Sequence, residues 1–555
     1  MKNVFTLIAF LSLFFSCAAQ EKTKESLVQS TQKETSTRPK LVVGIVVDQM
    51  RYDYLTRFES KFGKGGFMRM INEGFNCKNN HFNYVPTYTG PGHASVFTGT
   101  TPKYHGIISN NWYDKEIKQS VYCAQDDNVE SVGTETTAGK MSPNRMLTTS
   151  VADENRLFTQ MRGKTIGIAI KDRGAILPAG HTANAAYWFH GKNEGVWITS
   201  TFYRNDLPKW VKDFNSSDAV ESYLKVWDTY QPIETYVESG SDLNNYEKGF
   251  KGKETATFPY DLAALKDEND GFDVLKATAY GNSLTVDFAV AAIEGEALGK
   301  DDDTDVLTVS FSSTDYVGHN FGVNSKEIED TYIRLDRDLE RFFNYLDENV
   351  GEGEYTVFLT ADHGAVDVPA YLQSVKIPAG YLDYNDRKER FQKFLNEKYG
   401  TADIVENVSN NQLFFNKEKL KELKLDIHEV EQALVDEQIS YPNIAKVYTA
   451  TAMNSTNFTS GIEALLQNGF NQKRSGDVIV VDDIAYIAYG RTGSTHGSGL
   501  NYDTHVPLLF FGKGIKHGQT YEKTVIPDIA PTISALLGIS FPNGSIGDVL
   551  GFVIK

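Results

Sequence analysis

The sequence predicts an α/β fold in which helices cover both faces of a doubly wound, mostly parallel sheet. Five runs of apolar, often β-branched residues are short enough for strands that are buried on both faces. Amphipathic helical patterns separate several of these runs, as expected for such a sheet. The five runs are 41–47, 165–170, 306–311, 355–360 and 506–511.

Two long segments have the period of an amphipathic helix. From 326 to 348, apolar residues recur every three or four positions, which places them on one face. The second segment, 282–298, opens with Asn282, a residue type that favours the helix N-cap. We expect these helices to cover the sheet.

Two regions do not follow this alternation of strand and helix. Residues 190–275 are rich in aromatic residues, Asn, Asp and Gly with weak periodicity, whereas 385–475 contains charged helical patterns. We interpret both regions as insertions on one domain spanning 41–555, because the candidate site residues are spread over that whole range. The first insertion either overhangs the site or only extends the surface. The helical patterns of the second lie at 386–398, 417–423 and 427–435.

The N-terminal segment is typical of an exported protein. An apolar run from 4 to 15 precedes small residues, so we interpret 1–19 as a signal peptide and leave it out of the fold. Cys17 allows a second interpretation, as the lipidated first residue of an anchored protein. Residues 20–40 are almost wholly polar and suit a tether. We therefore expect either a periplasmic protein or an outer-membrane lipoprotein of a bacterium.

The composition limits the classes of partner that the protein is expected to bind. The net charge is −18 and no basic tract offsets it, so we expect no nucleic acid as a specific partner. Contact with a membrane is expected only through an anchor at Cys17, because no later apolar run is long enough to span a bilayer. In an oxidising compartment, Cys77 and Cys123 either form a disulfide or remain two buried thiols.

Aspartate and histidine residues follow the ends of the predicted strands. In doubly wound sheets, ligands gather beyond the carboxyl ends of the strands, so we expect these side chains to meet. Six oxygen and nitrogen donors suit two zinc ions, each with an open coordination position. The donors are Asp48, Asp315, His319, Asp362, His363 and, far downstream, His496.

Thr89 is the candidate nucleophile. It precedes Gly90-Pro91-Gly92, which lets the chain turn tightly into a helix whose free N–H groups and dipole favour an incoming phosphate. A hydroxyl bound to zinc can be an alkoxide near neutral pH. Thr87 competes by position, and a Thr in this context is more often part of a turn. The metal-ligand set downstream favours the catalytic interpretation.

Seven blocks occur in an order typical of a known family. From about residue 41 to its end, the chain resembles the alkaline phosphatase superfamily. Within it, the resemblance is to the phosphodiesterase/nucleotide pyrophosphatase-like branch that contains monomeric, phosphate-irrepressible bacterial alkaline phosphatases. The blocks are Val47-Asp48-Gln-Met-Arg, Pro86-Thr-x-Thr89, His105-Gly-Ile-Ile-x-Asn110, Lys171-Asp-Arg173, Ser313-Thr-Asp315-x-x-Gly-His319, Thr360-Ala-Asp362-His363 and Thr495-His496-Gly.

The resemblance implies the roles of the site residues. One zinc ion is expected on Asp315, His319 and His496. The other is expected on Asp48, Asp362, His363 and the Thr89 oxygen. The non-bridging oxygens of the phosphoryl group are expected on Asn110, Lys171 and Arg173. Because Lys171 occupies the neighbourhood where a related branch binds magnesium, no Mg²⁺ is expected.

The function expected from this resemblance is that of an exported, monomeric alkaline phosphatase. It would release inorganic phosphate from diverse small phosphomonoesters through a phosphothreonine at Thr89. The fork of Arg173 and the point charge of Lys171 favour a monoester dianion. The alternatives are a phosphodiesterase or nucleotide pyrophosphatase on the same two-metal site and, from another class, a non-catalytic surface binder of phosphorylated ligands. A sulfatase would need a convertible Cys or Ser, which Thr89 does not supply.

Overall fold

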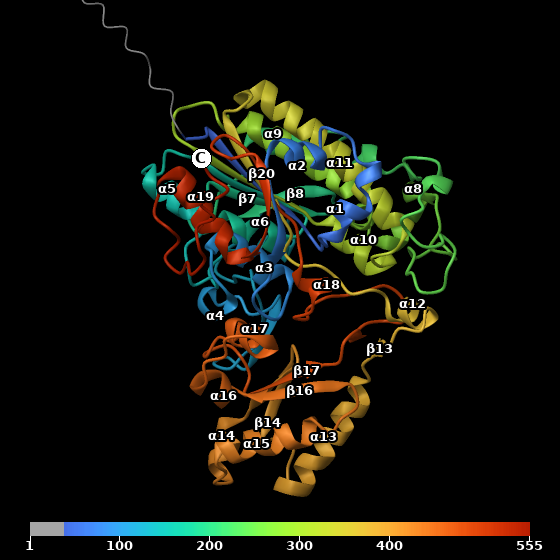
Figure 1. Ribbon diagram of the computed structural model, residues 1–555, viewed down its shortest axis with the longest axis vertical. Helices are drawn as coiled ribbons and strands as arrows, with labels where there is room; N and C mark the ends of the chain where they lie inside the picture. Colours follow the sequence, from blue (N-terminus) through green and yellow to red (C-terminus); the bar gives the residue numbers. More distant parts are fainter. Residues whose placement is uncertain (1–37) are drawn as a thin grey trace, which may run out of the picture. The chain divides into compact units, whose positions relative to one another are not determined.

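The computed structural model describes residues 38–555. The expected signal peptide, the possible lipid anchor at Cys17 and most of the tether lie outside the described residues. A ten-stranded mixed sheet with the order β20-β2-β19-β12-β1-β11-β6-β7-β8-β5 forms the centre (Figure 1). Three of its outer strands are β20 (Gly518–Val525), β7 (Ala185–His190) and β5 (Ser131–Val132). Helices pack on both of its faces, which confirms the predicted fold class.

Four adjacent strands in the middle of the sheet run parallel. Every residue in them is buried, as expected for strands covered on both faces. The register pairs Val46 with Thr360 and Val47 with Phe311, so the strands end at the same level. The loops that follow them therefore share one edge. The strands are β12 (Tyr355–Thr360), β1 (Leu41–Val47), β11 (Asp305–Phe311) and β6 (Thr165–Ala169).

The fifth predicted strand exists but runs antiparallel to its neighbours. β19 (Leu508–Gly512) pairs antiparallel with β12 and with β2 (Phe75–His81). The chain enters β19 from the segment containing His496, which lies at the carboxyl edge of the parallel strands. The interpretation of 506–511 as a parallel strand is therefore wrong, because a strand that starts at this edge must run in the opposite direction.

The two predicted long helices pack against each other. Ser325 caps the start of α11 (Lys326–Leu346), because its side chain accepts a hydrogen bond from the Ile328 N–H. α9 (Ala279–Gly295) begins earlier than predicted, and Asn282 is buried within it rather than capping it. The apolar face of α9 continues N-terminal to Asn282, so tertiary packing outweighs the capping preference. The helices on the opposite face are α3 (Thr89–Thr98), α5 (Val151–Phe158), α6 (Asp172–Ala179) and α19 (Ile529–Leu537).

The region predicted as the first insertion, 190–275, begins within the core, because its strand β8 belongs to the central sheet. Its other elements are short and pack onto the core. Trp227 and Tyr260 are fully buried in the same hydrophobic cluster as β1 and α11. Near the site, the Gly493 N–H donates to the Tyr246 carbonyl at 2.9 Å. The first insertion thus reaches the segment that leads to His496. Its elements include β8 (Val196–Ser200), α7 (Lys209–Asn215), β9 (Val226–Trp227), β10 (Tyr260–Asp261) and α8 (Leu262–Leu265).

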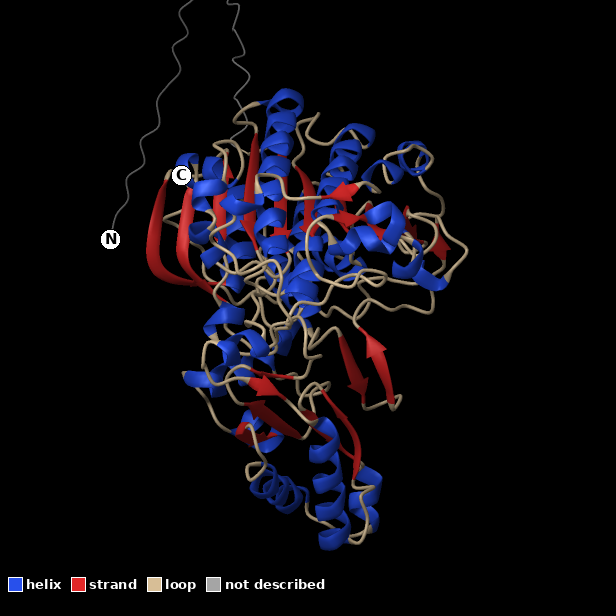
Figure 2. Cartoon of the chain, turned by 90° about the vertical axis from the view of Figure 1, so that its right-hand side faces the viewer, coloured by secondary structure: helices blue, strands red, loops and turns tan. Residues whose placement is uncertain are grey.

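The second insertion has a sheet of its own (Figure 2) and a separate hydrophobic cluster. It is longer than the predicted 385–475, because its first helix begins at Tyr384 and its last strand ends at Asp482. Its strand order is β14-β15-β17-β16, which the sequence patterns did not predict. Its helices are α13 (Tyr384–Tyr399), α14 (Lys417–Glu422) and α15 (Ile427–Gln438), at the three predicted places. Its strands are β14 (Val405–Ser409), β15 (Gln412–Phe415), β16 (Ile444–Thr449) and β17 (Val478–Asp482).

The two described cysteines form no disulfide. Cys77 and Cys123 are both buried and free, so the alternative of two buried thiols holds. Cys123 lies beside Gly90, where an added Cβ would come within 3.2 Å of its sulfur. Within 38–555, no helix has the length and apolar character required to cross a membrane.

Candidate active site

The predicted ligands lie at the carboxyl edge of the four parallel strands. Asp48 follows β1, and Asp362 and His363 follow β12. Asp315 lies in the first turn of α10 (Ser313–Phe321), directly after β11. Because the strands end at the same level, residues far apart in the chain meet here.

Two groups of side chains have the geometry to hold metal ions. One consists of Asp48, Asp362 and His363, and the other of Asp315, His363 and His496. Within each group the ligand atoms lie within 4.8 Å of one another. His363 belongs to both groups, and its ring stacks on His496 with centroids 3.5 Å apart.

His319 joins the second group through Asp315. The two residues are four apart on α10 and so share a face of the helix. His319 Nε2 lies 3.2 Å from Asp315 Oδ1, and His496 Nε2 lies 3.6 Å from the same oxygen. The three ligands predicted for one ion thus converge on one carboxylate oxygen, while His363, predicted for the other ion, is within reach of both groups.

Main-chain carbonyls orient the three histidines. An Nδ1–H that donates to a carbonyl leaves Nε2 of a neutral ring free to bind a metal. Burial lowers the pKa of His363 and of His496, which favours the neutral rings. The Nδ1–O distances are 2.7 Å from His319 to Ser494, 2.9 Å from His363 to Gly364, and 2.8 Å from His496 to Thr87.

Two carboxylate oxygens at the site lack hydrogen-bond partners. Asp48 Oδ1 and Asp362 Oδ2 are buried and accept no hydrogen bond within the described residues, although imidazole nitrogens lie 3.3–3.5 Å from them. Such oxygens are costly unless a proton or a cation satisfies them. Burial and the neighbouring Asp362 raise the pKa of Asp48. The combination of carboxylate oxygens and imidazole nitrogens fits divalent metal ions such as zinc.

Lys171 bridges the two groups. Its Nζ donates to Asp48 Oδ2 at 2.7 Å and to Asp315 Oδ2 at 2.5 Å. Burial opposes its charge, but Asp315 and Asp48 together raise its pKa, so the ammonium stays charged. Lys171 precedes the first residue of α6 and so lies at the positive end of that helix.

Arg173 and Asn110 are the other two predicted phosphate contacts. Arg173 Nη1 donates to the Tyr122 hydroxyl at 3.1 Å, and its buried Nε has no hydrogen-bond partner within 38–555. Asn110 Oδ1 accepts a hydrogen bond from the Gly90 N–H at 2.7 Å. Because the Asn110 oxygen already accepts the Gly90 N–H, its NH₂ group is the part of the side chain that can bind a further acceptor.

Thr89 is the first residue of α3, and it is buried beside the ligands. Its Oγ1 lies 3.4 Å from His363 Nε2. Close packing is needed here, because a Cβ at Gly92 would come within 2.3 Å of the Asp362 carbonyl oxygen. The hydroxyl of Thr87, the competing candidate, donates to the Ser498 carbonyl at 2.9 Å. The geometry therefore favours Thr89 over Thr87.

Gln49 is a site residue that the sequence did not reveal. Its backbone N–H donates to Asp362 Oδ1 at 3.1 Å, and its Nε2 donates to Asp315 Oδ1 at 2.8 Å. It thus holds one carboxylate from each metal group. Its φ of 65° is in the left-handed region, and such strained residues cluster at functional sites. Its place directly after Asp48 was the only signal in the sequence.

Two further side chains orient site residues and had no sequence signal. Asp503 Oδ2 accepts the N–H groups of Gly497 at 3.1 Å and Ser498 at 2.7 Å, and so holds the loop that carries His496. The Tyr122 hydroxyl binds Arg173. These partners come together only in three dimensions.

Comparison with known proteins agrees with this geometry. The family model for type I phosphodiesterase / nucleotide pyrophosphatase matches residues 42–506. Alkaline phosphatase PhoV of Synechococcus elongatus is 44% identical over 556 residues, which covers 100% of both chains. A protein of Myroides odoratus named calcium-transporting ATPase is 45% identical over 547 residues, 98% of this chain and 97% of that one.

The fold is also similar to that of a solved structure. The crystal structure of wild-type alkaline phosphatase PafA superposes with a TM-score of 0.90 and 44% identity, over 93% of this chain and 99% of that chain. The resemblance inferred from the seven sequence blocks is thereby confirmed. The chain belongs to the type I phosphodiesterase/nucleotide pyrophosphatase family.

Proposed function

We propose that this protein is a phosphate monoester hydrolase with Thr89 as its nucleophile. The observation that carries the proposal is the position of the Thr89 hydroxyl at the start of α3, 3.4 Å from His363 Nε2. His363 is the ligand shared by the two metal groups. PhoV and PafA are named alkaline phosphatases, which supports the same activity here.

The proposed cofactor is a pair of zinc ions. Asp48, Asp362, His363 and the Thr89 oxygen would hold one. Asp315, His319 and His496 would hold the other. When bound, the ions supply positive charge that lowers the pKa of the Thr89 hydroxyl and of a water molecule, and that offsets charge on the leaving oxygen. Lys171 places an ammonium group between Asp48 and Asp315, so magnesium is not part of the proposal.

Several residues position the phosphoryl group, and Thr89 bonds to it covalently. The free N–H groups at the start of α3 favour the phosphate dianion. The Asn110 NH₂ group, the Lys171 ammonium and the Arg173 guanidinium are donors for its non-bridging oxygens. The Thr89 oxygen attacks phosphorus, and the alcohol departs with the ester oxygen. Water then attacks the phosphothreonine, which restores the hydroxyl and releases inorganic phosphate.

Substitution of Thr89 tests the nucleophile. We expect Thr89→Ala to lower kcat/KM for p-nitrophenyl phosphate by roughly 10³-fold or more, because the covalent step is lost. Thr87→Ala is the matched control and should stay within about tenfold of wild type, since its hydroxyl binds a main-chain carbonyl instead. Acid quenching during turnover should trap labelled phosphothreonine in the wild type alone. Hydrolysis by Thr89→Ala at the wild-type rate would place the activity elsewhere.

Metal removal and substrate choice separate the alternatives. Chelation should abolish monoester hydrolysis, and zinc alone should restore it, as direct metal analysis would verify. The rate ratio for p-nitrophenyl phosphate against bis-p-nitrophenyl phosphate distinguishes a monoesterase from a diesterase, and a preference for the diester would reject the proposal. ATP belongs in the same assay, because the name of the Myroides relative includes an ATPase activity. A non-catalytic binder would turn over none of these substrates.

The proposed location follows from the N-terminal pattern. We propose export as a monomer, with Cys17 either removed with the signal or carrying a lipid. Fractionation of the native host distinguishes these outcomes, because only the lipidated form sediments with membranes and is released by Cys17→Ala. Recovery of the wild type in the cytoplasm would contradict export.

A further inference from the structure

We infer that Asn410, in a hairpin turn of the second insertion, is a positioning residue for the phosphate site. Its side chain holds the two residues that flank Asn110. This inference rests on the proposed function and goes beyond it by giving the second insertion a role in the reaction.

The turn is built to hold one conformation. Asn410 and Asn411 join β14 to β15, and their φ values are 52° and 56°. Two successive residues with positive φ match the twist of a two-residue hairpin, and Asn is among the residues that tolerate this conformation. The turn therefore restricts the backbone of Asn410, which limits the positions that its side chain can take.

The Asn410 amide binds on both sides of Asn110. Its Nδ2 donates to the Asn111 carbonyl at 2.7 Å, and its Oδ1 accepts a hydrogen bond from the Ser109 hydroxyl at 3.2 Å. The only bond to the Asn110 carbonyl within the described residues comes from the Cys123 N–H, at 2.9 Å. Asn110 is thus held between the core and the second insertion.

Asn110 transmits this position to the nucleophile. Its Oδ1 accepts the Gly90 N–H at 2.7 Å, and Gly90 directly follows Thr89. One bonded path therefore leads from the insertion, through Asn410 and Asn110, to the first turn of α3. Misplacement of a positioned group by about 1 Å can lower a rate by about 10²-fold.

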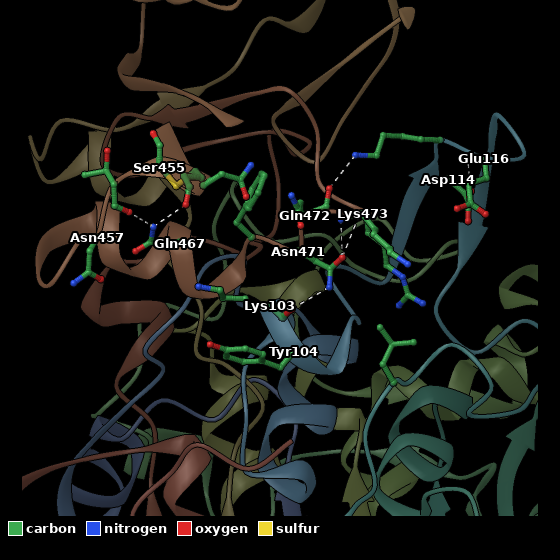
Figure 3. Close-up of a pocket in the computed structure, with 17 residues that line it drawn as sticks. Lys103, Tyr104, Asp114, Glu116, Ser455, Asn457, Gln467, Asn471, Gln472 and Lys473 are labelled. Atoms are coloured by element: carbon green, nitrogen blue, oxygen red, sulfur yellow. Dashed lines mark hydrogen bonds between the residues drawn. The ribbon is translucent and has the colours of Figure 1, made fainter. Parts of the chain in front are cut away.

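Other contacts of the second insertion also reach this segment. Phe414 of β15 packs edge-on against Tyr113, with ring centroids 5.3 Å apart. Arg474 lies over the Trp112 ring and donates to the Gly106 carbonyl at 2.5 Å. Asn471 Nδ2 donates to the Lys103 carbonyl at 3.0 Å, and Lys115 Nζ donates to the Ser475 carbonyl at 2.8 Å. Between these contacts is an open cavity of about 880 Å³ (Figure 3). Side chains from both sides line it. Among the hydrogen bonds of the second insertion, those of the Asn410 amide bind both neighbours of Asn110.

Asn411 provides a matched control in the same turn. It has the same backbone conformation, but its partners lie within the insertion. Its Nδ2 donates to Asp482 Oδ2 at 2.6 Å, and its Oδ1 accepts the Tyr384 hydroxyl at 3.2 Å. Glycine at either position keeps the positive φ and removes only the side chain.

The test compares Asn410→Gly with Asn411→Gly in full-length, zinc-loaded protein. We expect Asn410→Gly to lower kcat/KM for p-nitrophenyl phosphate by roughly tenfold, and mainly through kcat, because Asn110 and Thr89 are misplaced. Asn411→Gly should stay within about twofold, because its partners do not touch the site. Equal losses in the two variants would overturn the inference.

A double-mutant cycle shows whether the effect passes through Asn110. In an Asn110→Ala background, Asn410→Gly should cost little further activity, because the group it positions is gone. An undiminished tenfold loss in that background would contradict the inference. If Asn410→Gly does not fold, Ser109→Ala and Asn410→Asp, which each remove one of the two bonds, serve in the same cycle.

Failure of the inference about Asn410 can be distinguished from failure of the proposed function. An active Thr89→Ala variant would reject the proposed nucleophile. An inactive Thr89→Ala variant together with a fully active Asn410→Gly variant would reject only the role of the hairpin.

Discussion

The two insertions interrupt the same core but attach to it in different ways. Buried aromatic residues of the first, such as Trp227 and Tyr260, belong to the hydrophobic cluster of the central sheet. Those of the second, such as Phe391 and Phe415, form a cluster of their own. An insertion that shares the core contributes to its stability, whereas one with a separate core can open by itself. The second insertion can therefore affect the site without contributing to the stability of the central sheet.

One carboxylate on α11 shows how closely the first insertion is joined to the core. Asp330 accepts hydrogen bonds from Trp227 Nε1 at 2.7 Å, the Tyr230 N–H at 2.6 Å and the Tyr236 hydroxyl at 2.6 Å. Three parts of the insertion thus depend on one buried acceptor.

The largest expected effect is on global stability. Trp227→Ala removes a fully buried indole from the shared cluster, and we expect a loss of about 3–5 kcal/mol in the free energy of unfolding. Guanidinium denaturation followed by the fluorescence of the remaining tryptophans would measure it. Activity per folded molecule should not change. A loss of stability confined to the first insertion would contradict the claim that this insertion shares the core of the central sheet.

A smaller, local effect is expected in the second insertion. Leu434→Ala creates a cavity in the separate cluster and should cost about 2–4 kcal/mol there. Amide hydrogen exchange should show lost protection in α13–α15 and β14–β17, with protection in β1 and β11 retained. If protection falls equally in both regions, the second insertion is not a separate folding unit.

A third test measures stability as a function of pH. Burial raises the pKa of Glu327 to about 8, and the Tyr260 hydroxyl donates to its Oε1 at 2.5 Å. Burial also raises the pKa of Glu247, on the first insertion, to about 10. Because the folded pKa of each exceeds the ordinary 4.5, the stability they contribute is complete below pH 4.5 and is lost as pH rises through about 8 and about 10.

The expected change is a lower melting temperature at alkaline pH. Each group can contribute at most about 1.4 kcal/mol per pH unit between its unfolded and folded pKa. Glu327→Gln mimics the protonated form and should flatten the slope between pH 5 and 8. A mutant slope equal to that of the wild type would remove Glu327 from the explanation. Local stability of the second insertion, measured by hydrogen exchange, should not follow the Glu327 titration.

The central sheet could be predicted because its parallel strands are uniformly buried. The four-stranded sheet was not predicted although β15 and β17 are short apolar runs, because its edge strands β14 and β16 are mostly half-buried or exposed and lack such a run. The direction of β19 and the start of α9 depended on where distant segments lie.

The site divides in a similar way. Ionisable ligands such as Asp48 and His363 are recognisable from residue type and from their positions after strands. Gln49, Asp503 and Asn410 act through amide and main-chain hydrogen bonds, and an Asn or a Gln in a loop has no chemistry that singles it out. Their partners are set by tertiary structure alone.

The hydrogen bonds from the three imidazole Nδ1 atoms to main-chain carbonyls affect how the site tolerates mutation. The acceptors belong to Thr87, Gly364 and Ser494, and every amino acid has the same carbonyl group. Side chains at these positions can change over evolutionary time without altering the tautomers of the ligands, provided that the backbone keeps its path. Insertions, deletions or prolines that shift these short loops would misdirect the histidines even when every ligand is retained.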